Sequence, residues 1–148
     1  MRIVCIGYRD WALKIYDKLA QEFDYNFLII RNKNQYNELV IRDFKPDYIL
    51  FYGWSWIIKS EVLRNFKCLM LHPSPLPLYR GGSPIQNQII DGLEESMVTI
   101  FKMDDEIDAG PIFFQKEYSL EGTLQDIFDR ISDIGFRSEE HTSELQSR

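Results

Sequence analysis

The sequence predicts an α/β protein with a Rossmann-like, open, mainly parallel sheet and helices on both faces. Short β-rich runs alternate along the chain with stretches in which apolar residues have helical spacing. The β-rich runs are apolar almost throughout, as expected for parallel strands that are covered on both sides. At 148 residues, with 45% hydrophobic and 27% charged residues, the chain has the size and composition of one globular domain.

In the first half of the chain, four predicted strands alternate with three predicted helices. The strands cover residues 2–6, 26–30, 47–51 and 67–71, and the helices cover residues 10–23, 35–44 and 59–64. Asp10 is the predicted N-cap of the first helix. Lys45-Pro46 ends the second helix, because a proline disfavours helical backbone in the residue before it. This alternation is typical of a parallel sheet with helical crossovers.

The chain changes character after the fourth predicted strand. Residues 72–84 contain four prolines and two glycines, which predict a structured loop rather than a helix or a central strand. A helix over 85–90, strands over 98–102 and 111–118, and a helix over 123–134 are then predicted. Thr123 is the predicted N-cap of this last helix, and Asp126 stands in the capping-box position.

Residues 137–148 differ from the rest, because they are polar and show no helical or strand periodicity. They also resemble the in-frame translation of a short-read sequencing adapter. We therefore expect a non-native tail there and exclude it, with His141, from functional reasoning. A native disordered tail is the alternative. The predicted domain covers residues 1–136 and is expected to be C-terminally truncated relative to the natural protein.

Composition excludes several classes of function. The net charge is −6 and the basic residues are scattered, which argues against a nucleic-acid surface on this segment. No apolar run approaches the roughly 20 residues that cross a bilayer, and the N-terminus lacks the features of a signal peptide. Cys5 and Cys68 lie in apolar stretches, which predicts buried, reduced thiols, no metal site and a cytoplasmic protein.

His72 is the first candidate for a functional residue. It follows the fourth predicted strand, and ligands of open parallel sheets bind beyond the carboxyl ends of the strands. The turn after the first strand, residues 7–12, has a single glycine and is not a GxGxxG motif, which argues against a dinucleotide. A phosphate-binding GxxxxGK[ST] loop is also absent from the sequence.

Two blocks of sequence carry a resemblance to a known family. The first, residues 71–86, is LHPSPLPLYRGGSPIQ; the second has VTI at 98–100, MD at 103–104, IDAGPI at 107–112 and Gln115. Together they resemble the folate-dependent formyltransferases, which include enzymes acting on methionyl-tRNA, on glycinamide ribonucleotide and on nucleotide sugars. The resemblance covers about residues 1–134, and it implies a formyltransferase-type Rossmann-like fold and 10-formyltetrahydrofolate as cosubstrate.

The resemblance implies that His72 and Asp108 are catalytic. Formyl transfer to an amine requires removal of a proton and stabilisation of an oxyanion, and an imidazole oriented by a carboxylate suits both tasks. The family has asparagine two residues before this histidine, where Met70 stands here. A thioether donates no hydrogen bond, so Met70 cannot replace that amide. Another donor such as His72, Asn87 or a backbone N–H, a slow enzyme, and a loss of activity are all open alternatives.

The resemblance also implies residues for binding. The pterin is expected against Tyr52, Gly53, Trp54, Ser55 and Trp56, with Asp104 and Ile107 in the loop that closes over it. Core packing of the two tryptophans is an equal alternative. Substrate contacts are expected from Arg9 and Asp10 in the first turn, and from Ser74, Tyr79, Arg80 and Gly81 in the proline-rich loop. A surface ion pair is an equal alternative for Arg80.

The predicted function is therefore formyl transfer to a primary amine, with an amino sugar on a nucleotide as the favoured acceptor because the domain is acidic and short. Three alternatives remain: methionyl-tRNA as acceptor, hydrolysis of formyltetrahydrofolate, and a non-catalytic folate- or sugar-binding homologue, suggested by Met70. A homodimer through a C-terminal part beyond residue 136 is a further expectation.

Overall fold

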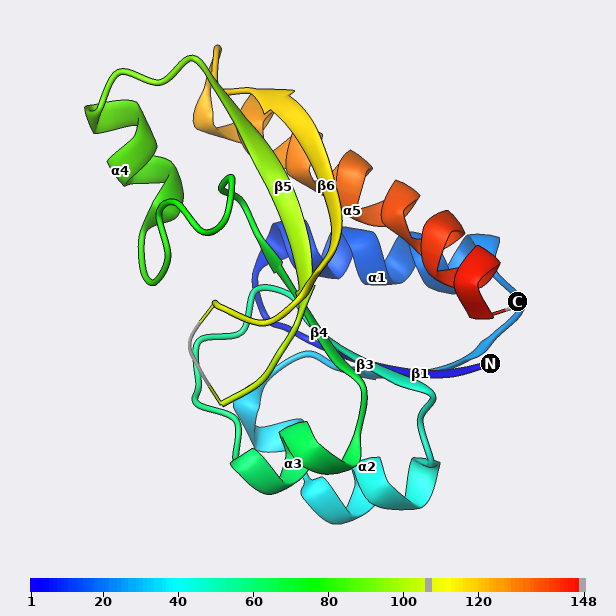
Figure 1. Cartoon of the computed structure of the whole chain (residues 1–148). Helices are drawn as coiled ribbons and strands as arrows, with labels where there is room; N and C mark the ends of the chain where they lie inside the picture. The colour runs from blue at the N-terminus through cyan, green and yellow to red at the C-terminus, as the bar shows by residue number, and fades with distance from the viewer. Residues whose placement is uncertain (106–107, 147–148) are drawn as a thin grey trace.

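The computed structural model describes residues 1–105 and 108–146. Six strands form one sheet in the order β2-β1-β3-β4-β5-β6 (Figure 1). The strands are β1 Arg2–Ile6, β2 Asn26–Ile30, β3 Tyr48–Phe51, β4 Cys68–His72, β5 Glu95–Lys102 and β6 Ile112–Ser119. The first four strands are parallel, whereas β5 is antiparallel to both of its neighbours. The predicted mainly parallel sheet is confirmed.

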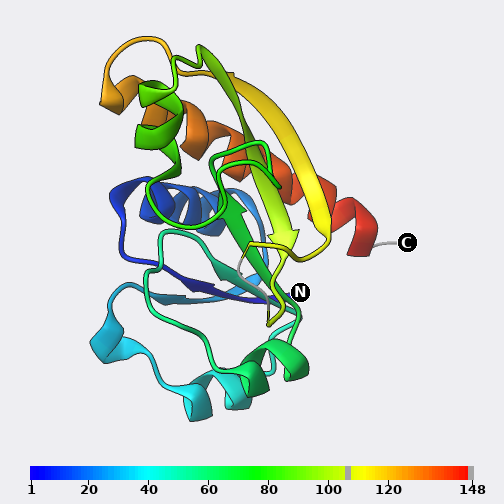
Figure 2. The same cartoon turned by 60° about the vertical axis from the view of Figure 1, so that its left-hand side comes forward.

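Helices cover both faces of this sheet, as predicted (Figures 1 and 2). The helices are α1 Asp10–Glu22, α2 Glu38–Phe44, α3 Ser60–Asn65, α4 Pro84–Ile90 and α5 Leu124–Gln146, with a short 3₁₀ turn at Lys33–Gln35. Helices α1 and α5 lie together on one face, and α2 and α3 lie on the other. Helix α4 stands beside the loop that follows β4. Among the described residues, no helix has the length and apolar character to cross a membrane.

Some predicted element ends differ from the structure. Helix α1 has Arg9 as its N-cap, so Asp10 is its first residue and not the predicted cap. Helix α2 begins at Glu38 rather than at residue 35, because the Asn37 side chain accepts hydrogen bonds from the N–H groups of Leu39 and Val40 and so caps it there. Strand β5 begins three residues before the predicted position, at Glu95.

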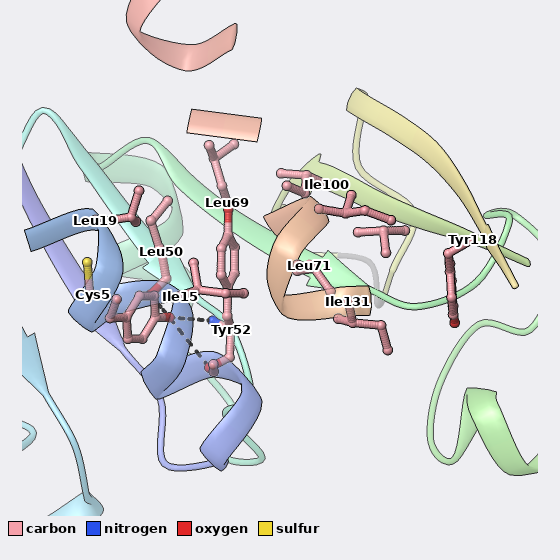
Figure 3. Packing of buried hydrophobic residues seen from close by; sticks show 14 of the residues in the cluster. Cys5, Ile15, Leu19, Leu50, Tyr52, Leu69, Leu71, Ile100, Tyr118 and Ile131 are labelled. Carbon is pink, nitrogen blue, oxygen red and sulfur yellow. Dashed lines mark hydrogen bonds between the residues drawn. The ribbon is translucent and has the colours of Figure 1, made fainter. Parts of the chain in front are cut away.

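Alternation along the strands divides the core into two layers. On β4, Leu69 and Leu71 pack toward α1 and α5, whereas Cys68 and Met70 belong to the cluster on the α2 and α3 side. Figure 3 shows the first of these layers, with Tyr52 packed beside Leu50 and Leu69. His72 continues the Met70 side of the strand, so it emerges on the α2 and α3 side at the carboxyl end of β4.

The one glycine in the turn after β1, Gly7, is required for steric reasons. A Cβ atom at Gly7 would collide with the backbone carbonyl oxygen of Tyr52, which follows β3. The adjacent N–H of Tyr8 donates to the carbonyl of Gly53 at 3.2 Å. The glycine thus permits close contact between two neighbouring strand ends, and it does so without the further glycines of a dinucleotide-binding turn.

Helix α5 begins as predicted and ends later than predicted. The capping box is confirmed: Thr123 Oγ1 accepts from Asp126 N at 3.1 Å, and Asp126 Oδ2 accepts from Thr123 N at 2.9 Å. The helix then continues past residue 134 to Gln146, which the lack of periodicity after Phe136 did not predict. Ser138 and Glu139 are buried there against the core. The foreign origin of residues 137–148 remains a prediction.

Glu139 generates a prediction about stability and pH. Both carboxylate oxygens are buried without a hydrogen-bond partner among the described residues, and burial raises the pKa of Glu139 from 4.5 to about 7. The folded state therefore binds an extra proton between these two pKa values. We expect the Glu139 contribution to the free energy of unfolding to fall by about 3 kcal/mol as the pH rises from 4.5 to 7.

The measurement is urea denaturation of the wild type and of Glu139→Leu across this pH range. The variant should be the more stable protein at pH 8, and the difference between the two should shrink toward pH 4.5. Asp133→Asn, which changes an exposed carboxylate on the same helix, serves as the matched control. A constant difference between wild type and Glu139→Leu at all pH values would contradict the prediction.

Candidate active site

The imidazole of His72 lies at the end of β4 and is almost fully buried, with 6% of the residue exposed. Its partner across the antiparallel pair with β5 is Thr99. Directly opposed residues share a face of the sheet, so both side chains lie on the α2 and α3 side. The predicted position of His72 at the carboxyl edge of the sheet is confirmed.

His72 and Asp108 are brought together, as predicted from their separate sequence blocks. Nδ1 of His72 lies 3.6 Å from Oδ2 of Asp108, and the two side chains are 8% and 10% exposed. On the other side of the ring, Nε2 lies 2.7 Å from the backbone carbonyl oxygen of Tyr79. The same Asp108 oxygen accepts a hydrogen bond from the N–H of Gly81 at 2.8 Å. The carboxylate therefore faces both the imidazole and the proline-rich loop.

The loop after β5 carries Asp108 back along β4. Its start is fixed beside the amino end of β4, where Met103 N donates to the carbonyl of Cys68 at 2.8 Å. Asp108, at φ +51°, lies four residues further along that strand, at His72. The loop returns through Gly110, where a Cβ atom would collide with the carbonyl oxygen of Lys102. Close contacts to the sheet thus hold both ends of this loop.

Buried polar side chains hold the proline-rich loop in place, and the sequence did not predict this role. Thr99 Oγ1 donates to the carbonyl of Ser74 at 2.6 Å and accepts from Gln115 Nε2 at 3.0 Å. Gln88 Nε2 and the Tyr118 hydroxyl donate to the carbonyl of Pro73 at 2.9 and 3.0 Å. The available signal was the presence of polar residues, fully or largely buried, in otherwise apolar elements.

The residues expected around the pterin lie in two environments. The Tyr52 ring stacks on Tyr16 in the core and is fully buried, so only its backbone could contact a ligand. Gly53 adopts φ +62°. Trp54 is half-buried, with an indole N–H that has no partner among the described residues. Trp56 and Ser55 are exposed, and the Ser55 hydroxyl is 2.7 Å from that of Tyr8.

Trp54 is part of an apolar group that also includes Met70 of β4. Ile58, Met70 and Met103 pack with it against the core cluster on the α2 and α3 side. Met70, which stands where the family has asparagine, lies on the same face of the sheet as His72. Asp104 is exposed nearby in sequence, and Ile107 lies outside the described residues.

The residues expected to contact the acceptor differ in their exposure to solvent. Arg9 is exposed and places its guanidinium 4.8 Å from the centre of the Tyr8 ring, beside exposed Asp10. Ser74, by contrast, is fully buried and its hydroxyl donates to the carbonyl of Leu78. Burial of Ser74 leaves it a structural role in the loop.

Tyr79 and Arg80 occupy the turn between the loop and α4. Tyr79 is half-buried at φ +58°, and its hydroxyl donates to Asp91 at 2.7 Å. This hydrogen bond raises the pKa of the Tyr79 hydroxyl above its usual value. Arg80 is exposed.

Two other kinds of site find no support in the described residues. Cys5 and Cys68 are buried free thiols, as predicted, and burial raises the pKa of Cys68 to about 12, so neither is poised as a nucleophile. No group of three His, Cys, Asp or Glu within residues 1–105 and 108–139 could hold a metal. A surface hollow of about 480 Å³ between α1 and α5 is bordered by Lys14 and Phe136, on the other face of the sheet from His72.

Comparison with known proteins identifies the family. A family model described as "Formyl transferase" matches residues 2–137. The chain belongs to the formyl transferase family. Among related formyl transferases, a methionyl-tRNA formyltransferase of Wolbachia pipientis is 35% identical over 97 residues, which are 63% of this chain and 32% of the relative. That of Thermotoga maritima is 45% identical over 83 residues, which are 55% of this chain and 26% of the relative.

Two solved structures have the same fold. The methionyl-tRNA formyltransferase from Clostridium thermocellum superposes with a TM-score of 0.89 and 37% identity, over 99% of this chain and 66% of that chain. HypX from Aquifex aeolicus in complex with tetrahydrofolic acid has a TM-score of 0.85 at 21% identity, over 99% of this chain and 27% of that chain. This chain thus spans about a third of the length of the curated relatives it matches.

The buried hydrogen bonds around the loop generate a prediction about Thr99. Replacement by valine keeps the shape and removes the hydroxyl, which leaves the Ser74 carbonyl and the Gln115 amide without this partner. We expect Thr99→Val to lower the free energy of unfolding by about 1–3 kcal/mol, whereas Thr99→Ser, which keeps the hydroxyl, lowers it less. Urea denaturation of both variants is the measurement. A stability of Thr99→Val equal to that of the wild type would show that the hydroxyl does not stabilise the loop.

Proposed function

We propose that this chain carries the catalytic centre of an enzyme that transfers a formyl group from 10-formyltetrahydrofolate to the amino group of methionyl-tRNA. The observation that carries the proposal is the buried pair of His72 and Asp108, 3.6 Å apart, which comes from two separate sequence blocks in a chain of the formyl transferase family. A buried imidazole beside a carboxylate can act as the general base that amine formylation requires.

The proposal gives each ring nitrogen of His72 a separate task. The Tyr79 carbonyl can only accept a hydrogen bond, so Nε2 of a neutral His72 carries the hydrogen and Nδ1 has the lone pair. As the amine nitrogen attacks the formyl carbon, Nδ1 would take the amine proton, and Asp108 would stabilise the resulting imidazolium. Collapse of the oxyanion then breaks the bond between the formyl carbon and the folate nitrogen, and the proton leaves with that nitrogen.

The apolar residues on the α2 and α3 side of the sheet, the face on which His72 lies, suit a reduced pterin. Trp54, Ile58, Met70 and Met103 supply apolar surface, and the buried indole N–H of Trp54 lacks an acceptor among the described residues, which a polar ring atom could provide. The solved HypX complex, whose fold this chain shares, contains tetrahydrofolic acid. Trp54 and its apolar neighbours are therefore the residues that we expect to hold the cosubstrate.

The names of the relatives support methionyl-tRNA as acceptor, in place of the nucleotide-linked amino sugar that the sequence favoured. The net charge of −6 argued against nucleic acid. Acidity of one segment does not exclude a tRNA acceptor, however, because this chain spans only part of its relatives and the basic surface for a tRNA body can lie elsewhere.

The test is a formyl-transfer assay with 10-formyltetrahydrofolate and methionyl-tRNA. We expect formylmethionyl-tRNA from the wild type and a loss of about 10²–10⁴-fold in kcat for His72→Ala and for Asp108→Asn, because each removes part of the proton-transfer pair. Asp129→Asn, an exposed carboxylate on α5, is the control and should keep wild-type activity.

Other products would identify a different function. Formylation of a nucleotide-linked amino sugar alone would overturn the acceptor, and release of formate alone would indicate a hydrolase. Binding of the folate without any turnover would indicate a non-catalytic homologue. Full activity of His72→Ala would overturn the catalytic assignment itself.

Met70 generates a separate prediction. It lies two residues before His72 on the same face of β4, and its thioether cannot donate to a developing oxyanion. An asparagine there would add a donor, and one such donor contributes about 10²–10³-fold in rate. We expect Met70→Asn to raise kcat toward that limit in the same assay, with Met70→Leu unchanged or slower. An equal rate for wild type and Met70→Asn would show that the formyl oxygen is not bound at this position.

A further inference from the structure

We propose that Tyr79 is a positioning residue for His72: its backbone carbonyl fixes the imidazole tautomer, and its hydroxyl, anchored on Asp91, keeps that carbonyl in place. The inference rests on the proposed function, in which Nδ1 of His72 receives the proton. It changes the role of Tyr79 from the predicted substrate contact to a support of the catalytic base.

The carbonyl of Tyr79 selects between the two tautomers. It lies 2.7 Å from Nε2 of His72, within hydrogen-bond distance, whereas Asp108 lies at 3.6 Å from Nδ1. Both oxygens can only accept, and a neutral imidazole has one N–H to donate. The shorter contact therefore places the hydrogen on Nε2. The lone pair of Nδ1 then faces the Asp108 carboxylate.

The residue whose carbonyl contacts His72, Tyr79, adopts an uncommon backbone conformation. At φ +58°, a tyrosine is in the left-handed region, which residues with a bulky side chain avoid and which persists only where the surroundings hold it. The next residue along the turn that contacts the site, Gly81, also has a positive φ and donates to Asp108. The turn thus contacts both members of the catalytic pair.

The hydroxyl of Tyr79 makes the hydrogen bond that stabilises this backbone conformation. It donates to Oδ2 of Asp91 at 2.7 Å, and Asp91 is the C-cap residue of α4, where its own N–H donates to Asn87. Helix α4 is itself attached to the proline-rich loop through the buried Gln88. A continuous set of contacts therefore runs from α4 through Asp91 and Tyr79 to His72.

The test reads the tautomer directly. Nitrogen NMR of protein labelled at the histidine rings distinguishes a protonated from a bare ring nitrogen, and the chain has two histidines, so His141→Gln assigns the His72 signals. We expect the wild type to carry the hydrogen on Nε2. Tyr79→Phe should give a mixture of tautomers and lower kcat about five- to tenfold with an unchanged KM for the folate, the effect of losing one solvent-exposed hydrogen bond.

Variants of Asp91 provide an independent route to the same result. Asp91→Ala removes the acceptor and should reproduce the tautomer mixture, whereas Asp91→Asn keeps an acceptor oxygen and should restore the Nε2–H form. Adding Asp91→Ala to Tyr79→Phe should cause no further loss, because both act on one hydrogen bond. Tyr48→Phe, at a half-buried tyrosine on β3, is the matched control and should leave both tautomer and kcat unchanged.

The outcomes separate this inference from the proposed function. A wild-type His72 that carries its hydrogen on Nδ1, or a Tyr79→Phe protein with the wild-type tautomer and kcat, would overturn the positioning role. If Tyr79→Phe does not fold, the tautomer and kcat of Asp91→Ala test the positioning role in its place. A tautomer change in a protein that formylates no amine would support the positioning role and overturn the proposed function alone.

Discussion

The site depends on a constraint set by the prolines that follow β4. Proline has no N–H, so backbone donors within the loop serve only some of its carbonyls, among them those of Ser74 and Pro75. Here the carbonyls of Pro73 and Ser74 accept from side chains of α4, β5 and β6, chiefly Gln88, Thr99 and Tyr118. The loop cannot move without breaking bonds that are buried, and this gives the loop next to His72 a single conformation.

The geometry of the pair formed by His72 and Asp108 follows from this rigidity. His72 is held between two acceptors that come from different parts of the chain, the Tyr79 carbonyl and the Asp108 carboxylate. Both of those residues have positive φ values, which are costly and therefore need firm surroundings. A flexible loop would relax such conformations. The buried polar side chains of the sheet thus make a strained and well-defined site possible.

The sequence was sufficient for the fold and for the convergence of His72 and Asp108. Apolar strands alternating with helices predict the sheet, and the paired blocks around His72 and Asp108 predict that these residues meet. The sequence could not assign the supporting residues, because a threonine such as Thr99 in a β-strand looks the same whether or not its hydroxyl bonds to a distant loop. Tyr52 was placed with the cofactor although its ring lies in the core, since alternation fixes its face only when the register is known.

The antiparallel β5 has a consequence for how much this region can vary in length. Since β5 ends beside Cys68 while Asp108 must meet His72, the chain after Met103 has to cover four residues of strand, about 13 Å, against the direction in which β5 arrived. Four residues lie between Met103 and Asp108, and the five steps of chain that join the two span roughly 17 Å when extended. The loss of two or more residues here would leave the carboxylate out of reach of the imidazole, whereas insertions would not.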